Sequence, residues 1–282
     1  MEIAKQIAPI ALAIIMFGLG LGLTINDFIR VIKIPRDFFV GIICQVILLP
    51  IVAFILIKIM PLSAELALGI MIIAAAPGGV TSNVLTKFAN GDVALSVSLT
   101  AIVSLMSIIT VPFIIFTSAN LLGVIDINKD ISMISIGLKM CFVVSVPVIL
   151  GMIIRKLMND FIIAKTILIQ RISIILFLIV FISIWVEEWD KIVSFLTRVG
   201  SVSLILNLTM IFLGYYIAKY FASGIAQRKC ISLECGLQNG TLAVFVATQL
   251  FDEIIFLVPT AAYALIMFLT SIIFVLKVRK IS

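Results

Sequence analysis

Long apolar runs follow one another along almost the whole chain, and short polar segments separate them. A helix that crosses a membrane needs about 20 mostly apolar residues. The pattern predicts nine such spans, and each of them reads as helix. They cover residues 6–23, 37–59, 64–88, 91–121, 131–154, 163–185, 200–222, 227–251 and 254–277. We therefore expect an all-α polytopic membrane protein.

The composition of the chain supports the same class of protein. Its 282 residues are 63% apolar and only 12% charged, whereas a soluble domain is about 45–50% apolar and about 25% charged. These values exclude a disordered chain, a nucleic-acid-binding domain and a disulfide-stapled secreted module. The chain has no histidine, and its four cysteines lie in or beside apolar runs without a CxxC pair. We expect the thiols to pack as small hydrophobic groups and predict no metal cluster.

The basic residues are distributed unevenly between the two sets of span ends. Because Lys and Arg concentrate in cytoplasmic loops, this bias predicts an outside N-terminus and a cytoplasmic C-terminus in the plasma or inner membrane. The richer set consists of Arg30, Lys33, Arg36, Lys87, Arg155, Lys156, Lys165, Lys219, Arg228, Lys229, Lys277, Arg279 and Lys280. The poorer set consists of Lys5, Lys58, Lys129, Lys191 and Arg198, with the acids Asp126, Asp130, Glu187, Glu188, Asp190, Asp252 and Glu253.

Two of the predicted spans are interrupted near their middle. The span 64–88 contains Pro77, Gly78 and Gly79, and the span 227–251 contains Gly236 and Gly240 on either side of residues 237–239. Proline removes a backbone donor and glycine removes the constraint of a side chain, so both disfavour a regular helix. One such break would be a kink. Two breaks followed by polar residues indicate backbone that lines a cavity, because its free polar groups need partners.

The order of the two interrupted spans adds a prediction about topology. They are the third and the eighth span, and an odd offset reverses the direction of crossing. This is the pattern of an inverted-topology repeat, in which two discontinuous helices meet at the membrane midplane and hold ion and substrate. The sequence therefore favours a secondary transporter that works by alternating access.

Among the 14 Asp and Glu residues, Glu234 alone lies deep within a predicted span. An ionisable group at that depth is a functional hypothesis by default. Its expected company is neutral oxygen ligands, and a carboxylate among such ligands suits sodium, whereas Mg²⁺ or Ca²⁺ normally requires more carboxylates. The alternatives are a proton on Glu234, or a salt bridge to Lys139 or Arg171, whose roles the sequence leaves open. The neutral candidates are Gln45, Ser82, Asn83, Ser96, Thr100, Gln238 and Asn239.

Two long motifs resemble a known family. The stretch APGGVTSNVLTKFANGDVALSVSLT (76–100) and the stretch ECGLQNGTLA (234–243) look like those of the bile acid:sodium symporter (BASS) family, as do the FGLGL turn of the first span and Gln45. The chain is identified on these residues as a bacterial member of the family. The family usually has a tenth, N-terminal helix, and we expect nine helices here without it.

The resemblance implies a core domain (37–122 and 200–278), a panel domain (1–36 and 123–199) and two sodium ions behind the crossing of the broken helices. No organic cofactor is expected. The first sodium site would use Ser82, Asn83, Ser96, Thr100 and Glu234. The second would use the side chains of Gln45, Glu234 and Gln238 and the carbonyl groups of Cys235 and Leu237.

The resemblance leaves the substrate open. Val80 replaces a hydroxyl residue of the family's motif, and residues 266–268 replace a polar patch of some relatives. We expect a monomer that carries a bile-acid-like, pantoate-like or keto acid anion. Because helix N-termini attract anions, the anion should bind at Val80, Thr81, Asn239 and Gly240.

Three other functions are weighed against this one. A proton-coupled or efflux carrier of the same architecture would depend on pH instead of sodium, and a channel would conduct without saturating. An enzyme is not expected, because the sequence offers no nucleophile–base pair and no paired catalytic carboxylates.

Overall fold

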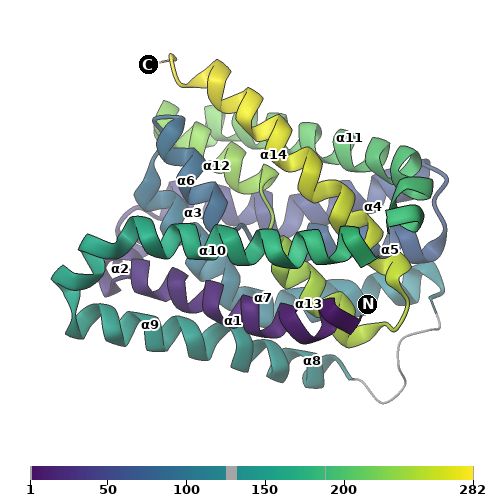
Figure 1. Cartoon of the computed structure of the whole chain (residues 1–282). Coiled ribbons are helices and arrows are strands. Elements are labelled where there is room, and N and C mark those ends of the chain that lie inside the picture. The colour runs from purple at the N-terminus through teal and green to yellow at the C-terminus, as the bar shows by residue number, and fades with distance from the viewer. Residues whose placement is uncertain (1, 125–131, 188, 282) are drawn as a thin grey trace.

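Helices account for most of the chain in the computed structural model, which describes residues 2–124, 132–187 and 189–281 (Figure 1). Within these ranges there is no β-strand. Asp126, Lys129, Asp130 and Glu188 of the charge pattern lie outside them. The α-helices are α1 (Glu2–Gly22), α2 (Ile25–Lys33), α3 (Pro35–Ile42), α4 (Leu49–Ile59), α5 (Ala64–Ala75), α6 (Val80–Phe88), α7 (Val93–Leu122), α8 (Met133–Met140), α9 (Val146–Leu157), α10 (Asn159–Glu187), α11 (Trp189–Phe221), α12 (Ile225–Gly236), α13 (Gly240–Leu250) and α14 (Val258–Val278).

Seven helical segments among the described residues are long and apolar enough to cross a membrane, as expected for a multi-pass membrane protein. They match seven of the predicted spans. The two spans predicted to be interrupted are each built from two shorter helices, α5 with α6 and α12 with α13. The candidate spans are Lys5–Gly22, Pro35–Ile59, Val93–Leu122, Met133–Leu157, Asn159–Val186, Ile192–Phe221 and Ile254–Val278.

Two of the long segments contain a π-helical turn just before a proline. The turn η1 (Ile43–Leu48) precedes Pro50, and the turn η2 (Cys141–Ser145) precedes Pro147. A proline ring clashes with the carbonyl group four residues earlier, and a widened turn relieves this clash. The first of these turns includes Gln45, which lies buried inside the molecule.

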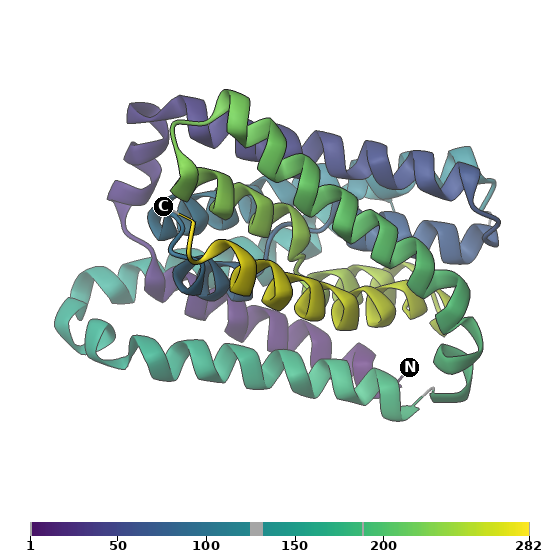
Figure 2. The same ribbon diagram turned by 90° about the horizontal axis from the view of Figure 1, so that it is seen from above.

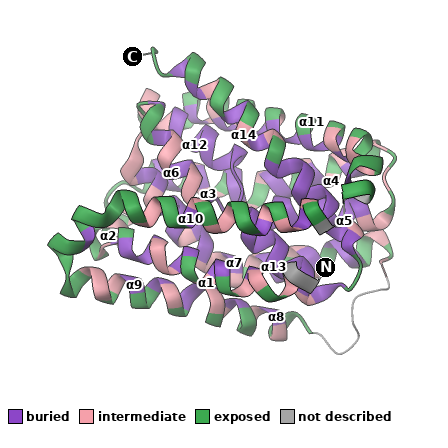
Figure 3. Cartoon of the chain, viewed as in Figure 1, coloured by how far each residue is buried: buried purple, intermediate pink, exposed green. Residues whose placement is uncertain are grey.

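The two breaks lie inside the helix packing. Residues 76–79 are extended between α5 and α6, and residues 237–239 are extended between α12 and α13. Figure 3 shows that buried residues concentrate on α5, α12 and α13, whereas α9 and α10 expose much of their surface. From above, α14 lies between α11 and α10 (Figure 2). The breaks therefore occur where the backbone is best covered by protein.

The charged segment that precedes the predicted span 200–222 is helical where the structure describes it. From Trp189 onward it forms the first turns of α11, which runs without interruption to Phe221. The helix therefore begins before the apolar run that predicts its span.

Glycine allows α1 to lie directly against α9. A Cβ atom on Gly20 would overlap the backbone carbonyl oxygen of Val148, and one on Gly151 would overlap the carbonyl oxygen of Phe17. Small residues that let two backbones approach closely are a common device for packing membrane helices. The pair α1–α9, with α10 also packed on α1, forms one side of the molecule.

This close approach predicts a specific loss of stability. Gly20→Ala should lower the free energy of unfolding by about 1–3 kcal/mol, because the added methyl group must push α9 away. Gly22→Ala is the matched control, since nothing lies within 4 Å of a Cβ atom there. Thermal unfolding in detergent would compare them. Equal melting temperatures for Gly20→Ala and wild type would contradict the packing described.

Candidate functional site

The two extended segments meet and pair with each other. Gly78 and Gln238 form an isolated antiparallel bridge, and the backbone N–H of Asn239 donates to the carbonyl oxygen of Pro77 at 2.8 Å. Each break thus supplies hydrogen-bond partners for the other, which helix interiors normally find within their own chain. The breaks are a single structural unit.

The carboxylate of Glu234 lies against this unit and is fully buried. Its Oε1 atom accepts hydrogen bonds from the hydroxyl groups of Ser82 and Ser96, both at 2.5 Å. The hydroxyl group of Thr100 lies 3.2 Å from Oε1 and 3.1 Å from Oε2. The hydroxyl groups come from α6 and α7, so residues distant in sequence meet at one charge. Among the described residues, no Lys or Arg forms an ion pair with Glu234.

The short oxygen–oxygen contacts around Glu234 outnumber the hydroxyl protons that are available to form hydrogen bonds in them. The Ser96 hydroxyl has one proton, yet its oxygen lies 2.5 Å from Glu234 Oε1 and 2.8 Å from Asn83 Oδ1. The Ser82 hydroxyl likewise reaches both Glu234 Oε1 and the carbonyl oxygen of Gly79, at 2.7 Å. A hydroxyl group donates only one hydrogen bond. With Glu234 ionised, some of these short oxygen–oxygen contacts therefore lack a proton, and either a bound cation or a proton on Glu234 would satisfy them.

Two glutamine side chains contact the backbone of α12 at Glu234 and Cys235. The amide of Gln45 donates from Nε2 to the backbone carbonyl of Glu234 at 3.1 Å, and Gln238 Nε2 donates to the carbonyl of Cys235 at 2.9 Å. The Oε1 atoms of both glutamines are buried without a hydrogen-bond partner. Buried acceptors without partners are rare and costly. The pair suits a cation, and Leu237 lies beside it in the same extended segment.

Gly78 leaves the space that this arrangement needs. A Cβ atom there would overlap Glu234 Oε2 and would lie 2.8 Å from Gln45 Nε2. The glycine therefore does more than loosen the helix, because any side chain would displace the carboxylate.

The four residues predicted to bind an anion line one small cavity of about 30 Å³. This cavity faces Ile15 of α1 and Phe177 of α10, and it has room only for water in this conformation. Its wall includes Asn239 and Thr241, whose Nδ2 and Oγ1 atoms are buried without a partner, and also Gln238, whose Oε1 atom is buried without a partner. The predicted residues in its wall are Val80, Thr81, Asn239 and Gly240.

A larger cavity of about 480 Å³ begins beside it and is also lined by Val80. It continues along α1, α6, α7 and α10 as far as Lys87 and Phe88, at the C-terminal end of α6. In this conformation the space next to the breaks therefore extends toward the basic end of the molecule, on the left in Figure 1.

Comparison with known proteins decides the family. A model of the Sodium Bile acid symporter family matches residues 9–195, which is more than half of the chain. The chain belongs to the sodium bile acid symporter family. Members of this family are transporters and not enzymes, as the sequence analysis predicts.

Three relatives show how widely the sodium bile acid symporter family is spread. The chain is 29% identical over 255 residues to "Uncharacterized sodium-dependent transporter YocS" of Bacillus subtilis, covering 90% of this chain and 77% of that protein. It is 28% identical over 254 residues to "Probable sodium/metabolite cotransporter BASS1, chloroplastic" of Arabidopsis thaliana, covering 89% and 61%. It is 28% identical over 251 residues to "Ileal sodium/bile acid cotransporter" of Mus musculus, covering 85% and 68%. Sodium is the coupling ion that these names imply.

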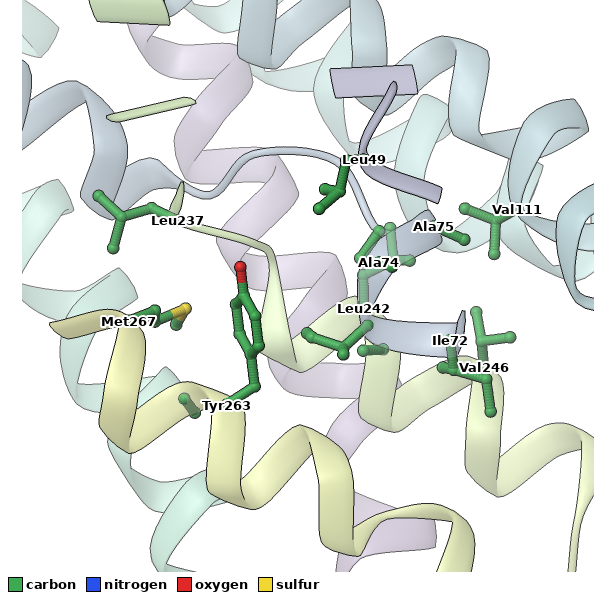
Figure 4. Close-up of a cluster of buried hydrophobic side chains, with 14 of the residues drawn as sticks. Leu49, Ile72, Ala74, Ala75, Val111, Leu237, Leu242, Val246, Tyr263 and Met267 are labelled. Carbon is green, nitrogen blue, oxygen red and sulfur yellow. The ribbon is translucent and has the colours of Figure 1, made fainter. Parts of the chain in front are cut away.

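The structure adds residues that the sequence analysis did not select. The break frees the carbonyl group of Gly236, which accepts hydrogen bonds from Asn207 Nδ2 at 2.7 Å and from the Tyr263 hydroxyl at 3.3 Å. Asn207 Oδ1 in turn accepts from the Thr270 hydroxyl at 2.5 Å. In Figure 4 the hydroxyl group of Tyr263 points toward the extended backbone that follows Leu237. A lone Asn within an apolar span is the only sequence signal for this cluster.

Lys139, whose role the sequence left open, lies away from Glu234. Its Nζ atom donates to Gln249 Oε1 at 2.8 Å, which connects α8 to α13. No hydrogen bond or ion pair of Arg171 occurs in the described residues.

The Gly236 contacts predict that Asn207 stabilises the break. Asn207→Ala should lower the free energy of unfolding by about 1–3 kcal/mol, because it leaves a buried carbonyl and a buried hydroxyl with fewer partners. Ser203→Ala is the control, since this serine is buried one turn earlier on α11 and its hydroxyl has no partner. Thermal unfolding in sodium-free buffer would compare the two. Equal destabilisation of both variants would contradict the role of Asn207.

Proposed function

We propose that the protein is a sodium-coupled symporter that carries a small organic anion across the membrane by alternating access. The observation that supports this most strongly is the set of buried oxygen atoms around Glu234, which has too few protons for its short contacts. A thermal-shift screen of organic anions, in sodium against potassium, tests the proposal and identifies the substrate. An anion that stabilises the protein in sodium but not in potassium is the expected result. Stabilisation that follows pH instead of sodium would favour the proton-coupled alternative.

Two sodium ions would bind on either side of the Glu234 backbone. The first would lie among Ser82, Asn83, Ser96, Thr100 and the Glu234 carboxylate. The second would use the unpartnered oxygens of Gln45 and Gln238, together with Glu234 and the carbonyl groups of Cys235 and Leu237. One carboxylate among neutral oxygens suits a monovalent cation better than a divalent one, because Ca²⁺ usually takes several carboxylates.

The organic anion would bind on the opposite face of the same breaks. The helices α6 and α13 begin at Val80 and Gly240, and each N-terminus carries roughly half a positive charge. The unpaired Asn239 Nδ2 and Thr241 Oγ1 would donate to the anion. Its apolar part would face α1 and α10 in the cavity that extends toward Lys87. The substrate would be a bile-acid-like, pantoate-like or keto acid anion.

The transport motion would separate two domains. The panel (1–36 and 123–199) would contain α1, α2, α8, α9 and α10, and the core (37–122 and 200–278) would contain the breaks. The packing of α1 on α9 and α10 is consistent with this division. In this proposal the two broken segments complete nine crossings in an inverted repeat, and a single monomer transports.

The proposed orientation puts the basic end in the cytoplasm. Several residues assigned to that side lie together, since Arg30 pairs with Asp92 at 2.6 Å and Arg36 donates to the carbonyl oxygen of Phe221. At the other end, Lys5 pairs with Asp252 at 2.5 Å. The structure as described would then be open toward the cytoplasm.

Glu234→Gln should abolish the stabilisation by sodium, because it keeps the shape of the side chain and removes the central charge. Gln45→Ala and Asn83→Ala should only weaken the sodium response, since each removes one neutral ligand. Thermal unfolding over a sodium titration measures this, and Glu65→Gln at the start of α5 is the control for loss of a carboxylate. A normal sodium response in Glu234→Gln would refute the proposed coupling site.

Thr81→Leu should weaken binding of the anion about tenfold or more and leave the sodium response largely intact, since the added bulk enters the small cavity. Thr86→Val, further along α6 and outside that cavity, is the matched control. Asn239→Leu should have a similar effect but would also remove the cap that Asn239 Oδ1 makes to Leu242 N at 3.0 Å. Loss of the sodium response with normal anion binding would mean that the two faces of the break are assigned in reverse.

The orientation is tested by cysteine labelling from outside intact cells. A membrane-impermeant thiol reagent should label Asp190→Cys and spare Arg36→Cys, and permeabilised cells should show labelling of both. External labelling of Arg36→Cys would overturn the proposed topology.

A further inference from the structure

A wide cavity of about 610 Å³ lies between the α1–α2 junction and the C-terminal part of α9. None of its lining residues lines the two cavities beside the breaks. Its walls include Ile25, Ile149 and Ile153, whose exposed fractions are 61%, 52% and 49%. Such apolar walls favour a ligand with a hydrocarbon part.

Two cations border this cavity without partners of their own. Arg155 and Lys156 lie in the last turn of α9, and neither forms an ion pair or hydrogen bond among the described residues. The Nε atom of Arg155 is buried and unpaired. A buried guanidinium N–H without an acceptor is costly, so the site lacks a group that would accept from it.

Two acids adjacent in sequence to the lining residues form no ion pair with these cations in the described part of the chain. Asp27 accepts hydrogen bonds from the backbone N–H and the hydroxyl group of Thr24, at 2.7 and 2.8 Å. Asp160 accepts from the side chain of Asn159 at 3.1 Å. Both carboxylates are engaged at the starts of helices, α2 and α10, where they offset the helix dipole. The cavity therefore combines unpaired positive charge with apolar walls.

We propose that this cavity binds a phospholipid with an anionic head group. Arg155 and Lys156 would hold the phosphate, which matches the fork of guanidinium donors. Thr24, Asn26 and Asn159, which also line the cavity, would contact the head-group oxygens, and an acyl chain would cover the isoleucine walls. Basic pockets between helices at a membrane surface are typical sites for such lipids.

The position of the cavity gives the lipid a structural consequence. Leu23–Asn26 forms the junction through which α1 continues into α2 and then α3. A lipid bound here contacts both this junction and α9. The lipid would therefore restrain the segment that connects α1 to α2 and α3, which lead to the helices around the breaks.

The inference rests on the membrane location of the protein and not on the proposed sodium coupling. Native mass spectrometry of the detergent-purified protein tests it, with phosphatidylglycerol and phosphatidylcholine of the same acyl chains as the two probes. Phosphatidylglycerol should bind more tightly. The double variant Arg155→Gln/Lys156→Gln should bind it about 30-fold more weakly, since a cation near the membrane surface contributes about fivefold. Lys277→Gln/Lys280→Gln, at the same end of the molecule, is the matched control and should bind normally.

A second variant tests the apolar part of the site without changing charge. Ile149→Trp should fill the cavity and also weaken binding of phosphatidylglycerol, while the sodium response stays normal. Glycerol phosphate, which lacks acyl chains, should fail to compete with the lipid. Equal binding of the two lipids, normal binding by the double variant, or full competition by glycerol phosphate would overturn the proposal.

Discussion

The burial of one carboxylate governs the central architecture of this protein. A charge inside the membrane is costly unless polar groups replace the water that it loses. For Glu234 these groups are hydroxyls of Ser82, Ser96 and Thr100, which belong to two other helices. The carboxylate itself can occupy this position only because Gly78 has no side chain, since a Cβ atom there would overlap Glu234 Oε2. The buried carboxylate of Glu234 therefore requires both the Pro-Gly-Gly break and the polar face of α7. These three features of the sequence depend on one another.

The second constraint is the supply of partners for backbone groups freed by the breaks. The carbonyl groups of Glu234 and Cys235 accept from glutamine side chains, and that of Gly236 accepts from Asn207 and Tyr263. Backbone groups in the membrane interior cannot form hydrogen bonds with bulk water, so the protein must provide a partner for each of them. The breaks consequently hold side chains from η1, α11 and α14 in the site, and a defect in any of these segments would reach the carbonyl groups of residues 234–236.

The sequence predicted those parts of the structure that leave a local signature. Apolar runs located seven spans that the structure matches, and Pro77 and the glycines located the two breaks. The Asn207 cluster could not be found in this way, because one Asn in an apolar run matches many roles until its neighbours in space are known. The position at which α11 begins could not be predicted either. Charged residues such as Asp190 indicate exposure to solvent, and solvent-exposed residues occur in helices and in loops alike.

The break at 237–239 carries unpartnered polar groups of both kinds. The acceptor oxygens of Gln45 and Gln238 are buried without a partner, and so are Asn239 Nδ2 and Thr241 Oγ1. Acceptors suit a cation and donors suit an anion, and both kinds occur at the same break. Under the proposed function, each ion lowers the electrostatic cost of binding the other, and this effect must be mutual. Coupling then needs no long path through the protein, because both ions share the same break.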